Sequence, residues 1–135
     1  MPESIGFEIS LTASYDEALQ HVTDELKKEG FGVLSRIDIH AAFKEKLDVD
    51  FRPYTILGAC NPPLAHRALT TVPEVGLLLP CNVTVEATAD GGALVRIVNP
   101  NTMMTVGNLG DDEVISGVGA EAYERLMRVA ASLRA

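Results

Sequence analysis

Apolar and polar residues alternate along several short stretches of the chain, with the period of two that is typical of strands buried on one face. The first stretch, residues 5–11, predicts a strand, and cap residues followed by apolar positions at helical spacing predict a helix over residues 12–30. Residues 31–39 are rich in amino acids that favour strands and predict a second strand. A short helix is expected over residues 41–47.

The middle of the chain predicts a core strand, a capped helix and a hairpin. Residues 54–60 form a nearly continuous apolar run, which is typical of a strand covered on both faces. Asn61 suits the cap of a helix over residues 62–72, whose first residue is a proline. Residues 77–87 contain a proline and predict one bent strand or two short ones, and a glycine-rich turn then leads to a strand over residues 93–98.

The last third of the chain predicts a loop and a long helix. The loop, residues 99–110, contains two methionines and two glycines and is expected to be the least constrained segment. From residue 111 onward apolar residues recur every three or four positions, which predicts an amphipathic helix that closes the chain. Three acidic residues at its start, Asp111, Asp112 and Glu113, suit the positive end of the helix dipole.

The order of these elements indicates an α+β fold of the β-α-β(4)-α type, a largely antiparallel sheet with helices packed on it and short extra helices after strands two and three. The length of 135 residues fits one domain, and no linker or repeat divides residues 1–135. Residues 54–60 and 77–85 are apolar on both sides of the pleat, so either helices cover both faces of the sheet or a second subunit does. We therefore expect a homodimer.

The composition disfavours several classes of protein. Hydrophobic residues make up 47% and charged residues 22% of the chain, which is typical of a globular protein and not of a disordered one. Eleven basic and nineteen acidic residues give a net charge of −8, which disfavours nucleic acid and anionic membranes as partners. No apolar stretch is long enough to span a bilayer, and no basic segment precedes an apolar one at the N-terminus, so a cytoplasmic location is expected.

Two Cys-Asn dipeptides are the strongest candidates for a site, Cys60-Asn61 and Cys81-Asn82. A thiol beside a helix N-terminus feels the positive end of the helix dipole, which favours the thiolate and makes Cys60 a candidate nucleophile. The side chains of Asn61 and Asn82 can offer hydrogen-bond donors to a ligand. If the strands that carry the two cysteines are neighbours, the sulfur atoms can approach each other. Plain packing of buried cysteines is the alternative interpretation.

Other residues could complete this site. His66 follows Cys60 by six positions and could serve as a base or a ligand, and an exposed helical histidine is the alternative. No zinc-type spacing of cysteine and histidine occurs, and neither a metal site nor a cofactor is expected. Met103 and Met104 could join the thiols on a copper(I)-type ion, or simply pack in the core. Arg52 could meet a carboxylate ligand, or pair with an acidic neighbour.

These residues are compatible with three functions. The leading hypothesis is a module that binds a small ligand or a redox partner in a pocket walled by Cys60, Asn61, His66, Cys81 and Asn82. The first alternative is a thiol-dependent redox or sulfur-transfer enzyme, with Cys60 as nucleophile, Cys81 as resolving thiol and His66 as base. The second is a structural or regulatory module whose apolar sheet binds a partner chain and whose cysteines are inert.

The segments around the two cysteines also resemble a known family. Residues 54–62, YTILGACNP, and residues 76–83, GLLLPCNV, are similar to the domain of unknown function 302 family, and the similarity extends from residues 27–31 to the last helix. The resemblance implies a fold like that of the TATA-binding protein, with one strand, one helix, four strands and a closing helix, commonly as a dimer. It implies no established activity. The net charge of −8 and the few aromatic residues give no reason to expect DNA binding.

Overall fold

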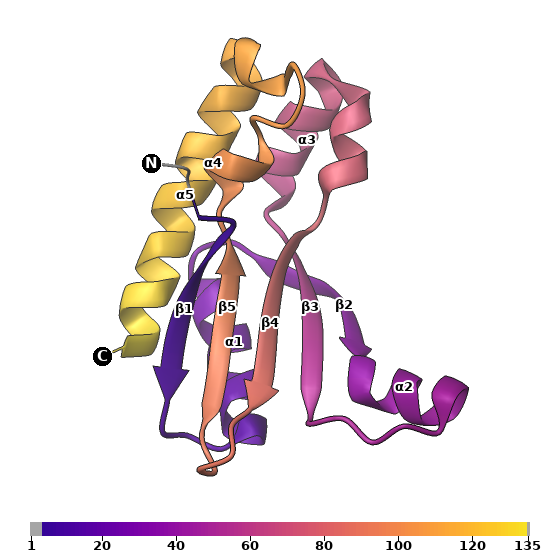
Figure 1. The fold of residues 1–135 in the computed structure, drawn as a ribbon. Coiled ribbons are helices and arrows are strands. Elements are labelled where there is room, and N and C mark those ends of the chain that lie inside the picture. Colours follow the sequence, from indigo (N-terminus) through magenta and orange to yellow (C-terminus); the bar gives the residue numbers. More distant parts are fainter. Residues whose placement is uncertain (1–3, 135) are drawn as a thin grey trace.

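The computed structural model describes residues 4–134, and these residues form one antiparallel sheet with helices on one face and at both ends (Figure 1). The strands are β1 (Gly6–Leu11), β2 (Gly32–Asp38), β3 (Tyr54–Cys60), β4 (Cys81–Ala87) and β5 (Ala93–Val98). They lie in the order β1-β5-β4-β3-β2, so the strands from β2 to β5 lie side by side in the order of the sequence, and β1 pairs with the free edge of β5. This topology confirms the expected α+β fold.

The helical segments form a pair on one face of the sheet, a group at one end of the strands and a single helix at the other end (Figure 1). They are α1 (Tyr15–Lys28), α2 (Ile39–Leu47), α3 (Pro62–Thr71), η1 (Pro73–Leu78), α4 (Pro100–Met103), η2 (Leu109–Asp111) and α5 (Glu113–Arg134). The long helices α1 and α5 cover one face, while α3, η1 and α4 gather where β3 ends and β4 begins (Figure 1). The short helices expected after the second and third strands are α2 and α3. Within the described residues, no helix has both the length and the hydrophobicity that a bilayer requires.

The hydrophobic core lies between the sheet and the two long helices. The apolar positions of the strands face the helices, and Ile9, Val95 and Val85 lie in register across β1, β5 and β4, each at most 2% exposed. At the edge of this face Phe7 of β1 packs edge-on against Tyr123 of α5, with ring centroids 5.6 Å apart. The alternation of apolar and polar residues in the sequence therefore predicts which side of these strands faces the core.

The segment before β4 differs from the sequence prediction. Residues 77–79 are predicted as strand, but η1 occupies the first two of them, and β4 begins only after Pro80, which follows a cis peptide bond. Proline has no N–H for a ladder, so the chain cannot continue as a strand through this point. Val75 of η1 is fully buried, whereas Leu77 is 88% exposed, so the apolar run is not a core strand.

The segment expected to be least constrained, residues 99–110, contains the short helices α4 and η2. Asn99 caps α4 by accepting a hydrogen bond from the N–H of Asn101 at 3.0 Å, and its amide donates to the carbonyl of Ser4 at 3.3 Å. Met104, directly after α4, is 3% exposed and belongs to the core. A cap and a buried side chain thus give this segment a defined conformation.

The face of the sheet that is turned away from α1 and α5 carries no described helix across its middle (Figure 1), and we call it the open face. The register places Tyr54 and Ile56 of β3 on this face, next to Glu86 and Thr84 of β4, and both β3 side chains are half-buried. Among the described residues, helices therefore cover β3 on one side only. The sequence left open whether helices or a second subunit cover the second face of the sheet, and the alternative of helices on both faces is wrong.

Candidate functional site

The two cysteines lie at adjacent strand ends. β3 ends at Cys60, β4 begins at Cys81, and Cys81 pairs with Ala59 in the ladder between the two strands. Because side chains alternate along a strand, the two thiols leave the pleat on opposite sides. Both nevertheless line one cavity of about 410 Å³ beyond the end of the sheet, which we call the thiol-lined cavity. The condition set in the sequence analysis, that the strands carrying the two cysteines are neighbours, is therefore met, and both residues line one cavity.

The walls of the thiol-lined cavity come from the ends of β2, β3 and β4 and from α3, η1, α4 and α5. Small residues make the space: Ala65 of α3 and Gly119 of α5 both line it. Larger apolar side chains complete the walls, among them Phe31, Leu34, Leu64, Leu69, Leu79, Met104 and Val118. None of the described lining residues is charged. The cavity is therefore apolar, whereas the thiolate hypothesis needs an electropositive surrounding.

Burial raises the pKa of both thiols. It raises the pKa of Cys60, which is half-buried. Burial, with a smaller contribution from the neighbouring Cys60, raises the pKa of Cys81 to about 11. Both cysteines are free thiols. The sequence predicts a lowered pKa for Cys60 from the dipole of α3, and the structure gives the opposite direction because loss of hydration disfavours the charged form and no described charged group lines the cavity to offset it.

Asn61 lines the same cavity and holds two helices in place. Its side-chain oxygen accepts a hydrogen bond from the N–H of Leu64 at 3.3 Å, which confirms it as the cap of α3. Its amide donates to the carbonyl of Glu29, at the end of α1, at 3.4 Å. Gly30 has a φ of +85°, and a Cβ there would come within 2.9 Å of the Asn61 amide, so glycine fits this junction. Asn61 thus has a structural role even without a ligand.

The other predicted site residues lie elsewhere. Asn82 is exposed, follows Cys81 on the opposite side of the pleat, and lines a separate hollow on the open face. His66 is exposed on the outer side of α3 and borders a different shallow hollow, with Arg67. The structure therefore brings together the two cysteines and Asn61, and it leaves His66 and Asn82 outside the thiol-lined cavity.

One of the two methionines joins the cysteines. Met104 lines the thiol-lined cavity, whereas Met103 packs against the core without lining it. A Cβ at position 119 would come within 3.2 Å of the Met104 side chain, so Gly119 makes room for it. Across residues 4–134, no three His, Cys, Asp or Glu side chains are grouped so that they could hold a metal ion.

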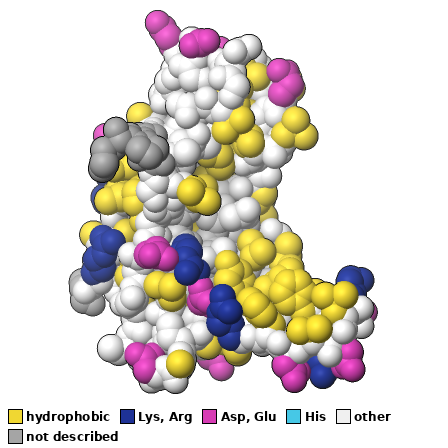
Figure 2. All heavy atoms as spheres, in the orientation of Figure 1, with side chains coloured by type: hydrophobic (Ala, Val, Ile, Leu, Met, Phe, Trp, Pro, Cys, Tyr) yellow, Lys and Arg dark blue, Asp and Glu magenta, His cyan; other side chains and the backbone are white. Residues whose placement is uncertain are grey.

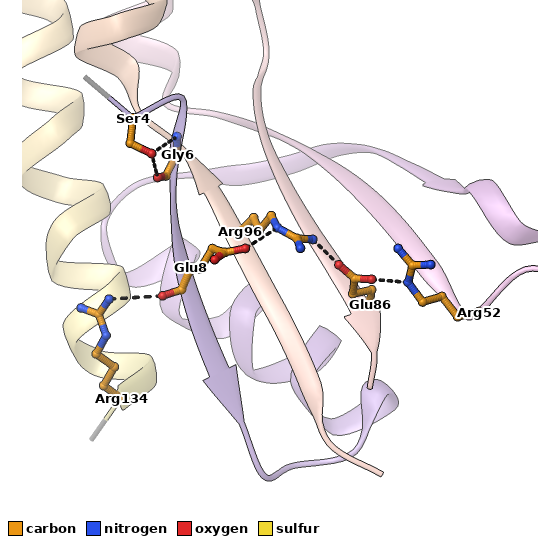
Figure 3. A network of polar contacts seen from close by, with 7 residues as sticks. All are labelled: Ser4, Gly6, Glu8, Arg52, Glu86, Arg96 and Arg134. Atoms are coloured by element: carbon orange, nitrogen blue, oxygen red, sulfur yellow. Dashed lines mark hydrogen bonds and ion pairs between the residues drawn. The ribbon is translucent and has the colours of Figure 1, made fainter. Parts of the chain in front are cut away.

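A row of four charged side chains crosses the open face (Figure 3). Glu86 of β4 accepts hydrogen bonds from Arg52 and from Arg96 of β5, and Arg96 Nε lies 2.8 Å from a carboxylate oxygen of Glu8 on β1. The Glu86 side chain is only 6% exposed. Burial alone raises the pKa of Glu86, but the hydrogen bonds from the two arginines outweigh burial and lower it.

Sequence reasoning did not find Glu86. It correctly expected an ion pair for Arg52 but placed the partner among the neighbours in sequence, whereas Glu86 lies 34 positions later. The signal was present in β4, where Thr84 and Glu86 alternate with apolar residues. Only the register between β3, β4 and β5 shows which arginines this carboxylate meets.

Comparison with known proteins agrees with the fold. The sequence profile of the family described as "Domain of unknown function DUF302" matches residues 7–133. The chain belongs to this family. A crystal structure of an uncharacterized conserved DUF302 protein from Bacillus stearothermophilus is similar to it, with a TM-score of 0.85 and 26% sequence identity over 98% of this chain and 100% of that one. No curated protein matches the sequence. The family resemblance of the cysteine segments is thereby confirmed, and the family itself carries no assigned activity.

Proposed function

We propose that this DUF302 protein binds a small molecule in the thiol-lined cavity. The observation that carries the proposal is the cavity itself, whose volume of about 410 Å³ lies in the range of about 300–1,000 Å³ that is typical of ligand pockets. Its walls include residues from both segments that carry the family resemblance, among them Cys60, Asn61, Gly76 and Cys81. As part of the proposal the protein acts in the cytoplasm, where a reducing environment keeps both thiols free.

Binding is favoured over thiol catalysis by the state of the cysteines. A nucleophilic thiol needs a substantial thiolate fraction near neutral pH, and burial raises the pKa of both Cys60 and Cys81. The base assigned by the enzyme hypothesis, His66, borders a different hollow. The alternative of a redox or sulfur-transfer enzyme therefore lacks both an activated thiol and a nearby histidine.

The rate of alkylation by iodoacetamide against pH tests the state of the thiols. In the native protein Cys60 is expected to react more slowly than free cysteine at neutral pH and to continue to speed up at alkaline pH, and Cys81, whose pKa is raised to about 11, is expected to react more slowly still. The variant Cys60→Ser separates the two signals. An apparent pKa below about 7 at Cys60 would favour the enzyme over the binding protein.

Ligand binding is tested with two-ring probes of similar size that differ in charge: methyl 2-naphthoate, 2-naphthoate and 2-naphthylmethylammonium. We expect at least one probe to bind the wild-type protein in saturation-transfer NMR and calorimetry. Ala65→Leu adds side-chain volume to the cavity and is expected to weaken binding roughly tenfold or more. The control Ala131→Leu makes the same change at an exposed position of α5. Failure of all three probes to bind, or equal effects of the two variants, contradicts the proposal.

We also propose that the protein forms a homodimer through its open face. Figure 2 shows hydrophobic side chains gathered over α2 and the segment that leads to β3. The exposed ones in that part of the chain are Ile37, Leu47, Val49 and Phe51, which we call the apolar patch; they are between 38% and 65% exposed. Patches of this kind mark interaction surfaces.

The charge on the open face favours a second copy as the partner. The whole chain carries −8, so two copies repel each other over most of their surface. The row formed by Glu8, Arg96, Glu86 and Arg52 holds two acids and two arginines and is neutral. The row adjoins the apolar patch, because the Arg52 guanidinium lies 4.5 Å from the centre of the Phe51 ring. Two copies can therefore meet across this face without bringing an excess of like charge into contact.

Sedimentation velocity on matched variants tests the dimer. Leu47→Glu places a charge in the apolar patch and is expected to give monomers. Leu77→Glu makes the same change at an exposed leucine of η1, far from the patch in the fold, and is expected to leave the dimer intact. A monomeric wild-type protein overturns the proposal, and so does a dimer that Leu77→Glu dissociates and Leu47→Glu does not.

A further inference from the structure

The described residues that line the thiol-lined cavity offer no opposite charge to a charged ligand. Among the described residues that line it there is no Asp, Glu, Lys, Arg or His. Asn61 is uncharged, its oxygen accepts a hydrogen bond from Leu64, and its amide donates one to Glu29. A charge placed among these walls would lose its hydration and gain no counter-ion, which costs far more than the burial of an apolar group.

Three residues that carry sulfur line the same space. Cys60 and Cys81 carry thiols, Met104 carries a thioether, and Phe31 also lines the cavity. Sulfur is polarizable and makes favourable contacts with the edges of aromatic rings. Aromatic rings also pack well on one another in edge-on or offset arrangements. This combination favours a flat aromatic ring over a saturated one of the same size.

The mouth of the cavity is apolar as well. β2 is irregular between Val33 and Ser35, where its pairing with β3 shifts by one residue. Leu34, at this irregularity, is 72% exposed and still lines the cavity, and Leu69 of α3 lines it at 40% exposure. The Ser35 hydroxyl, also in the lining, is the polar group available at this end. A ligand that enters here meets apolar side chains first and one hydroxyl beside them.

We infer that the ligand of the thiol-lined cavity is an uncharged, largely apolar aromatic molecule, whose ring contacts Cys60, Cys81 and Met104. This inference rests on the proposed function, because it names the class of molecule that the same cavity binds. The uncharged walls select against acids and amines, and the three sulfur atoms select for the aromatic ring. One hydroxyl or carbonyl on the ligand can meet Ser35 at the mouth.

Calorimetry with the three probes named above, together with methyl decahydro-2-naphthoate, tests the ligand class. The uncharged aromatic ester is expected to bind most tightly, and 2-naphthoate and 2-naphthylmethylammonium roughly tenfold or more weakly. The saturated ester keeps the size but loses the ring and is expected to bind about threefold more weakly. Met104→Leu keeps the volume but removes the sulfur, so it should bring the two esters closer in affinity, whereas Met103→Leu should not.

The outcomes separate this inference from the proposed function. If none of the probes binds, both fall. If the carboxylate or the ammonium probe binds as tightly as the aromatic ester, and Ala65→Leu abolishes that binding, the cavity is a ligand site but the inference is overturned. If the saturated ester binds as tightly as the aromatic one, or if Met103→Leu and Met104→Leu act alike, the assignment of an aromatic ring to the sulfur atoms is wrong.

Discussion

The buried carboxylate of Glu86 should stabilise the fold in a manner that depends on pH. Its side chain is 6% exposed and accepts hydrogen bonds from two arginines. A hydrogen bond to a charged group contributes about 1.5–3 kcal/mol. The two arginine side chains are 51% and 40% exposed, so water recovers part of what is lost when the carboxylate is removed. We expect Glu86→Gln to lower the free energy of unfolding by about 2 kcal/mol.

Urea denaturation and thermal unfolding measure this effect. For a domain of this size a loss of about 2 kcal/mol corresponds to a fall in Tm of roughly 6 °C. The pKa of Glu86 is lowered in the folded state, so its contribution is fully present above the pKa of the unfolded chain, about 4.3, and is lost as the pH falls through the lower folded pKa. The difference between wild type and Glu86→Gln should therefore be constant near pH 7 and shrink below about pH 4.

Glu8→Gln is the matched control. Glu8 lies at the exposed end of the same row, and its side chain is 61% exposed and pairs with Arg96. Its loss should cost no more than about 0.5 kcal/mol. If the two variants are equally stable, burial does not strengthen the contacts of Glu86. If the difference between wild type and Glu86→Gln persists unchanged in acid, the ionised carboxylate is not the source of the stability.

Two further pairs of variants test the packing near the site. A Cβ at Gly58 would overlap the Ser35 hydroxyl and come within 2.7 Å of the Pro80 ring, so Gly58→Ala should lower the free energy of unfolding, measured by urea denaturation, by about 1–3 kcal/mol. Gly117 lies in α5, and a Cβ there would meet nothing within 4 Å, so Gly117→Ala should raise the free energy of unfolding by about 0.5–1 kcal/mol. Asn61→Ala removes the cap of α3 and should lower the free energy of unfolding by about 1 kcal/mol or more in the same assay. Asn82 is exposed, so Asn82→Ala should change the free energy of unfolding very little. Equal effects within either pair of variants would contradict the assigned contacts.

The sequence predicts most of the elements because local signals determine them. The alternation over residues 5–11 gives β1 and its buried face, and Asn61 with the following proline gives the start of α3. The apolar run at residues 77–79 predicts a strand where the structure has the end of η1, because a short apolar run without periodicity does not distinguish a strand from a turn of helix. Only the fold shows that η1 buries Val75 and leaves Leu77 exposed.

The candidate site was harder to predict from the sequence than the helices and strands, because it depends on how distant segments pack. A cavity arises where side chains are small, and residues such as Ala65 and Gly119 leave no pattern that marks the space between them. The pKa of Cys60 depends on how far the folded chain removes it from water, which the dipeptide alone does not show. His66 is placed correctly on α3, but the side of the helix that it occupies turns it away from the cysteines.

The position of β1 at the edge of β5 affects how the chain assembles. Glu8 and Arg96 are joined across this edge although 88 positions separate them in the sequence. During synthesis the first strand therefore leaves the ribosome long before its neighbour exists, while β2 to β5 can pair as each emerges. Until β5 has been translated, β1 has no partner strand and its core-facing apolar side chains stay exposed. The nascent protein is therefore most prone to aggregation during this stage of its synthesis.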